Sequence, residues 1–154
     1  MSTQTLKAQV QADLHDAMRA REKVRAGTLR MVLTSITNEE VAGQEHRELG
    51  DDEVLRVIAK EAKKRKEAAT AYSEAGRGEL VAQEEAELAI LEEYLPAQLG
   101  DDELRALVAA AIDETGATGM PQMGQVMRAA QAMVAGRADA GRVAALVKES
   151  LLRR

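Results

Sequence analysis

A short run of small residues, Gly136–Arg142, leads into a predicted helix and carries two arginines. Free backbone N–H groups at a helix N-terminus attract anions, and a guanidinium can bind a phosphate through two parallel hydrogen bonds. This combination predicts a phosphate site whose residues are Gly136, Arg137, Gly141 and Arg142. Asp139 opposes the site if its carboxylate caps the same N–H groups. The local pattern alone leaves both interpretations open.

Other basic side chains extend or replace this site. Arg128 and Lys148 belong to the predicted helices on either side of the run and would add phosphate contacts there. An earlier predicted helix carries an alternative basic face, which consists of Lys60, Lys63 and Lys64. Because acidic residues are plentiful nearby, ordinary salt bridges on solvated helix faces explain the same lysines without any ligand.

The sequence contains no constellation typical of catalysis or metal binding. It has no cysteine, and its two histidines, His15 and His46, lack partners at the spacings of a zinc or di-iron site. The glutamates of residues 84–93 have the pattern of a solvated helix face rather than of a paired acid and base in a cleft. No phosphate loop or nucleophile motif occurs. We therefore expect no catalytic residue, no metal and no cofactor, and the chain is a poor candidate for a stand-alone enzyme.

The charge distribution excludes a uniformly basic nucleic-acid-binding protein. The 154 residues carry 21 basic and 26 acidic side chains, and the whole acidic excess lies in residues 51–95. Residues 96–154 are neutral overall, which still allows a local basic face. With no Trp, no Phe and two Tyr, the chain has no platform on which several bases could stack. It also lacks a signal-peptide pattern and a membrane-length apolar run, so we expect a soluble cytoplasmic protein with no membrane partner.

Apolar residues recur at helical spacing through almost the whole chain, and no segment alternates with a period of two. The pattern predicts an all-α protein of about seven helices without a sheet. The expected helices cover residues 3–20, 22–41, 51–75, 79–94, 101–115, 121–135 and 140–151. The segment Leu95–Gly100, which contains Pro96, is too short and too apolar for a flexible linker. We therefore expect two helical subdomains in contact, residues 1–95 and 96–154.

Helical spacing also suggests roles for individual side chains. Asp51 and Asp139 stand before predicted helices as candidate caps. Arg65 lies near the apolar seam of its helix, where it could pair inside the fold with a glutamate of residues 79–94. The four methionines of residues 120–133 either fill the core or form an adaptable surface for another protein.

An ordered set of motifs resembles the GatB/YqeY family, and the whole chain is similar to the short YqeY-like members of that family. The motifs are Ala17–Arg21, Leu29–Met31, Glu74–Leu80, Glu87–Leu99, Glu114–Ala117, Met123–Met127 and Gly136–Asp139. The resemblance implies an all-helical protein of two parts. The C-terminal part, from about Pro96, is similar to the tail of the B subunit of glutamine-dependent aminoacyl-tRNA amidotransferase. In that larger enzyme the tail contacts the body of the tRNA.

The resemblance also implies a function by association. The family label is carbon–nitrogen ligase activity with glutamine as amido-N-donor, but the catalytic domains of the larger enzyme cannot fit in 154 residues. We therefore expect a tRNA-associated module that binds by shape and phosphate contacts, with tRNA, an amidotransferase or another protein as candidate partners. The alternative is a helical protein-interaction adaptor with no nucleic-acid role, using residues 121–135 or the acidic residues 79–94.

Overall fold

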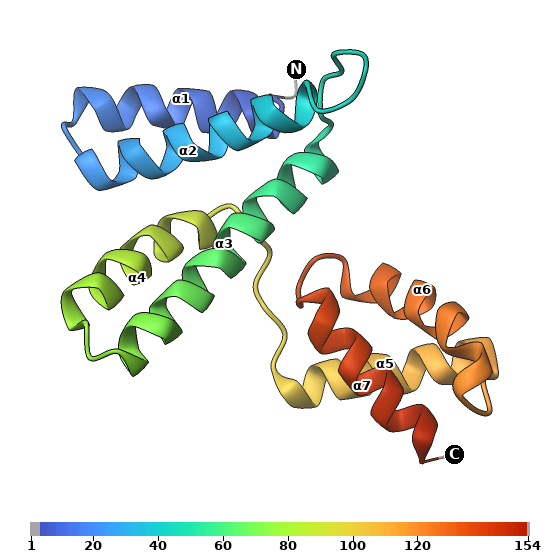
Figure 1. Cartoon of the computed structure of the whole chain (residues 1–154). Helices are drawn as coiled ribbons and strands as arrows, with labels where there is room; N and C mark the ends of the chain where they lie inside the picture. Colours follow the sequence, from blue (N-terminus) through green and yellow to red (C-terminus); the bar gives the residue numbers. More distant parts are fainter. Residues whose placement is uncertain (1–3, 154) are drawn as a thin grey trace. The chain divides into compact units, whose positions relative to one another are not determined.

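The computed structural model describes residues 4–153, and within that range it contains α-helices, one short 3-10 helix and no strand (Figure 1). The elements are α1 (Leu6–Arg19), α2 (Lys23–Glu40), α3 (Asp51–Glu74), α4 (Gly78–Glu92), α5 (Asp101–Thr115), η1 (Met120–Gln122), α6 (Met123–Val134) and α7 (Ala140–Leu152). This confirms the all-α fold of about seven helices that the sequence predicts. The chain divides into two compact units between Leu95 and Pro96, and each unit has its own hydrophobic core.

The N-terminal unit consists of two antiparallel helical hairpins, α1–α2 and α3–α4 (Figure 1). All four helices contribute to an aliphatic core. Its most deeply buried side chains are Val10, Leu29, Val32, Ile36, Val54, Ile58 and Leu91. Full burial of one such side chain stabilises the fold by roughly 1.5–3 kcal/mol, so this cluster is the main attachment between the two hairpins.

Asp51 has a different role from the one predicted. Gly50 occupies the N-cap of α3, and Asp51 is the first residue of that helix. Asp51 Oδ1 accepts the Leu6 N–H at 2.9 Å, while Thr5 Oγ1 accepts the Ala8 N–H at 3.1 Å. Since the first N–H groups of a helix have no partner within it, these two oxygens cap α1. The prediction that Asp51 caps α3 is wrong because its partner is distant in the sequence, which helical spacing cannot show.

A buried carboxylate holds the polar loop that follows α2. Glu40 is 2% exposed and accepts hydrogen bonds from Lys7 Nζ at 3.0 and 3.1 Å. It also accepts the Leu49 N–H at 3.3 Å. The hydrogen bond from Lys7 is the largest cause that lowers the pKa of Glu40 below its ordinary value of 4.5. The end of the loop is thereby attached to both helices of the first hairpin.

The C-terminal unit is a three-helix body of α5, α6 and α7. Its core is aliphatic, and its most deeply buried large side chains are Leu104, Val108, Ile112, Val126, Val134, Val143, Val147 and Leu151. Met123, Met127 and Met133 are half-buried and pack against this core, whereas Met120 is 36% exposed. Three of the four methionines therefore fill the core, as one of the two interpretations of the sequence expects.

Candidate functional site

The loop between α6 and α7 is bonded to the segment that leads into α5. The Leu99 N–H donates to the Arg137 carbonyl oxygen at 2.8 Å, and Arg142 Nη1 donates to the Leu99 carbonyl oxygen at 3.0 Å. Arg142 Nη2 also pairs with Asp101 Oδ1. The Arg142 side chain is 35% exposed, so part of its guanidinium still faces solvent while the rest joins α7 to the start of α5.

The side chain of Arg137 binds the end of the preceding helix. Its Nε donates to the Val134 carbonyl oxygen at 3.0 Å, and its Nη2 donates to the Met133 carbonyl oxygen at 2.8 Å. The last carbonyl groups of a helix have no intrahelical partner and carry partial negative charge. Arg137 thus stabilises the C-terminus of α6, and it is half-buried in doing so.

The two glycines of the predicted phosphate site have different conformational roles. Gly136 follows Ala135 out of α6, and both lie in the left-handed region with φ of +80° and +49°, a conformation that glycine adopts without strain. Gly141 lies in the first turn of α7, where an added Cβ would be 3.0 Å from Asp139 Oδ2. Asp139 occupies the N-cap position of α7, as predicted, but its side chain makes no capping hydrogen bond. Its carboxylate therefore lies beside the helix start that a phosphate would use.

Arg128 and Lys148 have the opposite environment. Both are exposed, Arg128 in the middle of α6 and Lys148 in the second half of α7. Neither side chain has a hydrogen bond or ion pair with any residue between positions 4 and 153. The structure thus separates the predicted basic residues into two that bind this chain's own backbone and two whose charges are available to a ligand.

The alternative basic face lies on α3. Lys60, Lys63 and Lys64 are all exposed, and Lys64 Nζ lies 3.4 Å from Glu61 Oε1. Lys64 is therefore part of an internal ion pair as well as of the surface. This matches the expectation that nearby acids engage some of these lysines.

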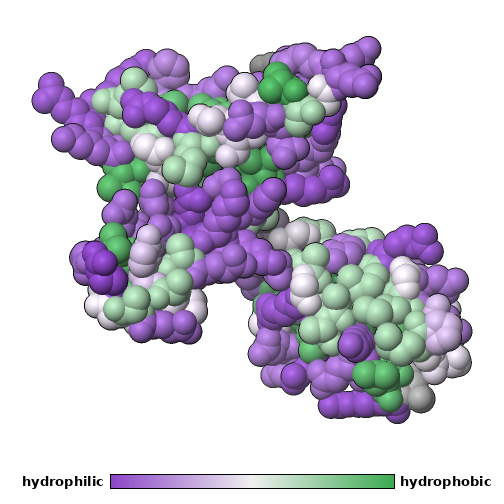
Figure 2. All heavy atoms as spheres, viewed as in Figure 1, coloured by the Kyte–Doolittle hydropathy of each residue, from purple (hydrophilic) through white to green (hydrophobic). Residues whose placement is uncertain are grey.

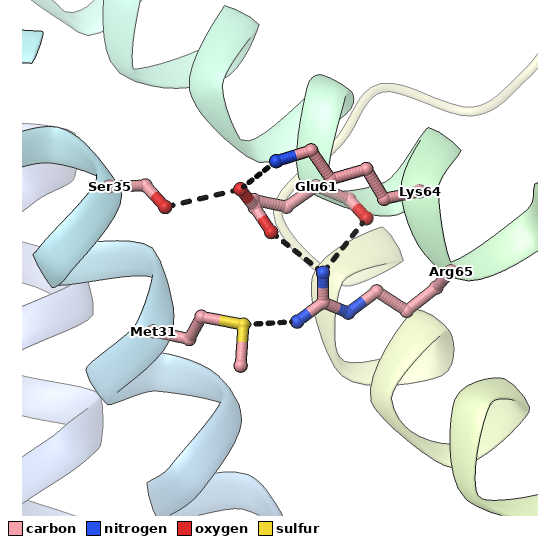
Figure 3. A network of polar contacts seen from close by, with 5 residues as sticks. All are labelled: Met31, Ser35, Glu61, Lys64 and Arg65. Atoms are coloured by element: carbon pink, nitrogen blue, oxygen red, sulfur yellow. Dashed lines mark hydrogen bonds and ion pairs between the residues drawn. The ribbon is translucent and has the colours of Figure 1, made fainter. Parts of the chain in front are cut away.

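A polar network beneath that face joins α2 to α3 (Figure 3). Arg65 Nη1 donates to Glu61 Oε2 at 2.6 Å, and Arg65 Nη2 donates to the Met31 sulfur. The Ser35 hydroxyl donates to Glu61 Oε1 at 3.1 Å. Glu61 and Arg65 are only 6% and 7% exposed, so this is a buried ion pair.

The partner of Arg65 differs from the one the sequence suggests. Arg65 pairs with Glu61 of its own helix, four residues earlier, rather than with a glutamate of α4. Glu87 of α4 is half-buried, and its pKa is raised by burial although the charge of Arg65 lowers it. For Glu61, burial raises the pKa, but the Ser35 hydroxyl and the positive charges of Lys64 and Arg65 bring it below 4.5. Spacing of four in a helix would have indicated this pair.

A second polar cluster, which the sequence does not indicate, surrounds a cavity of about 520 Å³ between α1, the α1–α2 corner and the end of α4. The Tyr94 hydroxyl donates to Asp13 Oδ2, and Arg25 Nη1 lies 2.8 Å from Glu93 Oε2. Burial, followed by this hydrogen bond, raises the pKa of Tyr94 well above its ordinary value. Both pairs attach the end of α4 to the first hairpin.

Within residues 4–153, no group of three or more His, Cys, Asp or Glu side chains is arranged to hold a metal ion. His15 and His46 are both exposed. In the same range, no helix combines the length and the apolar character that crossing a membrane requires.

Comparison with known proteins places the chain in a family. Residues 7–151 match the family model described as Yqey-like protein. The chain belongs to the YqeY-like family. The match extends through both units, which confirms the resemblance identified from the motifs. This YqeY-like chain is also similar to an uncharacterized protein of Schizosaccharomyces pombe, with 36% identity over 92 residues, covering 59% of this chain and 72% of that protein.

Proposed function

We propose that this YqeY-like chain is a tRNA-associated helical module that binds folded RNA through its C-terminal unit. The observation that carries the proposal is the pair Arg128 and Lys148, whose exposed charges have no internal partner within the described residues. The resemblance of residues 96–154 to a tRNA-contacting amidotransferase tail supports tRNA as the ligand. RNA helices are recognised mainly by shape and backbone contacts, so the chain needs no aromatic platform.

The basic residues have two roles in this proposal. Arg128 and Lys148 contact phosphates directly, because binding breaks no existing ion pair. Arg137 and Arg142 hold the α6–α7 loop against the start of α5 and contribute long-range positive charge. Gly136 permits the left-handed exit from α6. Because the whole chain has a net charge of -5, binding is weak and depends strongly on salt.

The proposed role is non-catalytic. Amide transfer with glutamine as the donor belongs in this proposal to an amidotransferase or similar ligase with which the chain associates. The described residues offer no group of side chains that could hold a metal ion, and in this proposal the chain contributes only RNA or protein contacts.

Titration of folded tRNA with the full-length chain at several salt concentrations tests this proposal. Arg128→Gln with Lys148→Gln removes two phosphate contacts, so the slope of log affinity against log salt should decrease in magnitude by about 1.5. The matched control, Lys60→Gln with Lys64→Gln, should keep the wild-type slope. Absence of wild-type binding at low salt, or an unchanged slope in the Arg128 and Lys148 variant, contradicts the proposal.

The alternative function, a protein-interaction adaptor acting through α6 or α4, has weaker support. Three methionines of α6 pack into the core, and the large apolar side chains of α4 are buried or half-buried in the N-terminal unit. These helices therefore offer little apolar surface to a partner. A different surface, on α2, has the properties that a protein partner requires.

A further inference from the structure

The outward side of α2 combines exposed apolar side chains with small residues. Val24 and Met31 are 52% and 43% exposed, and their spacing of seven residues places them on one side of the helix. Gly27 and Thr34 lie on that side too and are exposed. We name this surface the α2 outer face, and its residues are Lys23, Val24, Gly27, Arg30, Met31 and Thr34.

Positive charge borders this face. Lys23 and Arg30 are exposed along one edge, and neither side chain has a hydrogen bond or ion pair with any of the described residues. Residues 23–38 contain three basic residues and no Asp or Glu, although the chain as a whole is acidic. In Figure 2, green apolar patches interrupt the purple polar surface over α1 and α2, while the neighbouring surface over α3 is mainly purple.

The second edge of the face is formed by α3. The Met31 sulfur accepts a hydrogen bond from Arg65, which fixes the side chain of Met31 at the boundary between the two helices (Figure 3). The exposed side chains of Lys60 and Lys64 lie on α3. At Met31 the apolar strip of α2 therefore meets α3, the helix that carries these lysines.

Two residues in or just before α2 are not those that local backbone stability favours. Gly27 lies inside α2, where Ala is more favourable, and a Cβ added there would meet nothing within 4 Å. Internal packing therefore does not require glycine at this position. Arg21, in the corner before α2, has φ of +60°, a conformation that glycine adopts at lower cost. Gly27 thus leaves the surface of α2 without a side chain at this position, and Arg21 adds a further exposed positive charge. Both residues lower the local stability of the backbone.

We propose that the α2 outer face binds an acidic amphipathic helix of another protein. Val24 and Met31 contact the apolar side of that helix, and Gly27 allows its backbone to approach α2 closely. Lys23 and Arg30 pair with its glutamate or aspartate side chains, which also steers the encounter. This proposal does not depend on RNA binding by the C-terminal unit.

A second copy of the chain and RNA both fit this surface less well. Packing of α2 against α2 of a second copy would bring Lys23 and Arg30 near like charges. The acidic helix α4 has no free apolar side, because Ile90 and Leu91 are buried and its other large apolar side chains are half-buried. RNA phosphates pair with the cations but gain nothing from two exposed apolar side chains.

Site-specific photo-crosslinking tests the proposal. The full-length chain with Val24→p-benzoylphenylalanine is expressed in cells and irradiated, and the attached peptide is sequenced by mass spectrometry. The expected peptide is an acidic segment of another protein with apolar residues at helical spacing. A crosslink to a second copy of this chain, to nucleic acid or to lipid, or no crosslink at all, overturns the proposal.

A synthetic peptide with the sequence of the crosslinked segment is then titrated into the wild-type chain and into two matched charge-reversal variants. Lys23→Glu with Arg30→Glu should weaken its binding about tenfold, since two cations each lose a favourable pair and gain a repulsion. Arg128→Glu with Lys148→Glu, which changes the net charge equally, should bind like wild type. An equal loss of peptide affinity in both variants would mean that binding depends only on net charge, and would overturn the proposal that the peptide binds the α2 outer face.

Gly27→Ala separates binding from stability. The substitution should raise the midpoint of thermal unfolding, because alanine favours the helix. It should also weaken binding of the same peptide, because the added methyl group prevents the peptide helix from approaching α2 closely. A purely structural role of Gly27 would change the midpoint alone. Binding equal to wild type in Gly27→Ala therefore contradicts close helix contact at this face.

Discussion

The two units bury different kinds of side chain. Within the described residues, the buried polar and charged side chains all belong to the N-terminal unit and are Thr28, Glu40, Glu61 and Arg65. The buried core of the C-terminal unit contains Leu, Ile, Val and Ala alone. An unpaired buried charge is costly, so Glu61 and Arg65 favour the arrangement of α2 and α3 that keeps their polar partners within reach. Their contacts with Ser35 and Met31 of α2 therefore supplement the aliphatic packing between the two hairpins of the N-terminal unit, whereas the buried core of α5, α6 and α7 is aliphatic alone.

Removing one member of the buried ion pair should have the largest effect on the difference between the two units. Glu61→Ala leaves the guanidinium of Arg65 buried without its carboxylate and should destabilise the N-terminal unit by about 3 kcal/mol. Native-state hydrogen exchange reports the two units separately, and the amides of α5–α7 should keep their protection. The matched variant, Glu61→Leu with Arg65→Met, replaces both charges by apolar groups and should recover most of the loss. Equal destabilisation by the single and the double variant would contradict the role of the pair.

Acid should also act more strongly on the N-terminal unit. The folded-state pKa values of Glu40 and Glu61 lie below 4.5, so at acidic pH the unfolded chain binds more protons than the folded one. Their stabilisation is complete above about pH 4.5 and is lost as the pH falls through the folded-state values. In the C-terminal unit, the hydrogen bond from Arg142 lowers the pKa of Asp101, but this side chain is 73% exposed. Hydrogen exchange at decreasing pH should show the N-terminal unit opening first, and parallel loss in both units would disagree with this account.

Replacing one partly exposed arginine in each unit should lower the free energy of unfolding by a smaller amount. Arg142→Gln removes the hydrogen bond to the Leu99 carbonyl oxygen and should cost about 1 kcal/mol in the C-terminal unit. Arg25→Gln removes a partly exposed pair with Glu93 and should cost about 0.5 kcal/mol in the N-terminal unit. Urea unfolding of each variant measures both values. The opposite order would mean that the Leu99 contact contributes less than a surface ion pair.

The all-α fold could be predicted because each helix carries its own signals. Helical spacing of apolar residues, Gly116 after α5 and Asp139 before α7 are local features, and the structure has them where the sequence indicates. Contacts between distant segments could not be derived in this way. Asp51 caps α1 through Leu6, which lies 45 residues earlier. The Tyr94–Asp13 hydrogen bond likewise joins segments 81 residues apart.

The candidate site was predictable in composition but not in geometry. The sequence indicates which basic residues gather near α6 and α7, but it cannot show that Arg137 binds the carbonyl oxygens of its own helix end. It also cannot show that Arg142 reaches Leu99, because that contact depends on how the segment before α5 folds back. Arg128 and Lys148 can be selected from the predicted basic residues only when the structure shows which of those residues have internal partners.

We propose RNA contact for the C-terminal unit and protein contact for the α2 outer face. Amide chemical-shift mapping of the ¹⁵N-labelled full-length chain during titration with folded tRNA distinguishes the two surfaces. The perturbed amides should cluster in α6 and α7 around Arg128 and Lys148, while those of residues 23–34 should stay unchanged. Perturbations confined to the N-terminal unit, or no perturbation at low salt, would contradict this expectation.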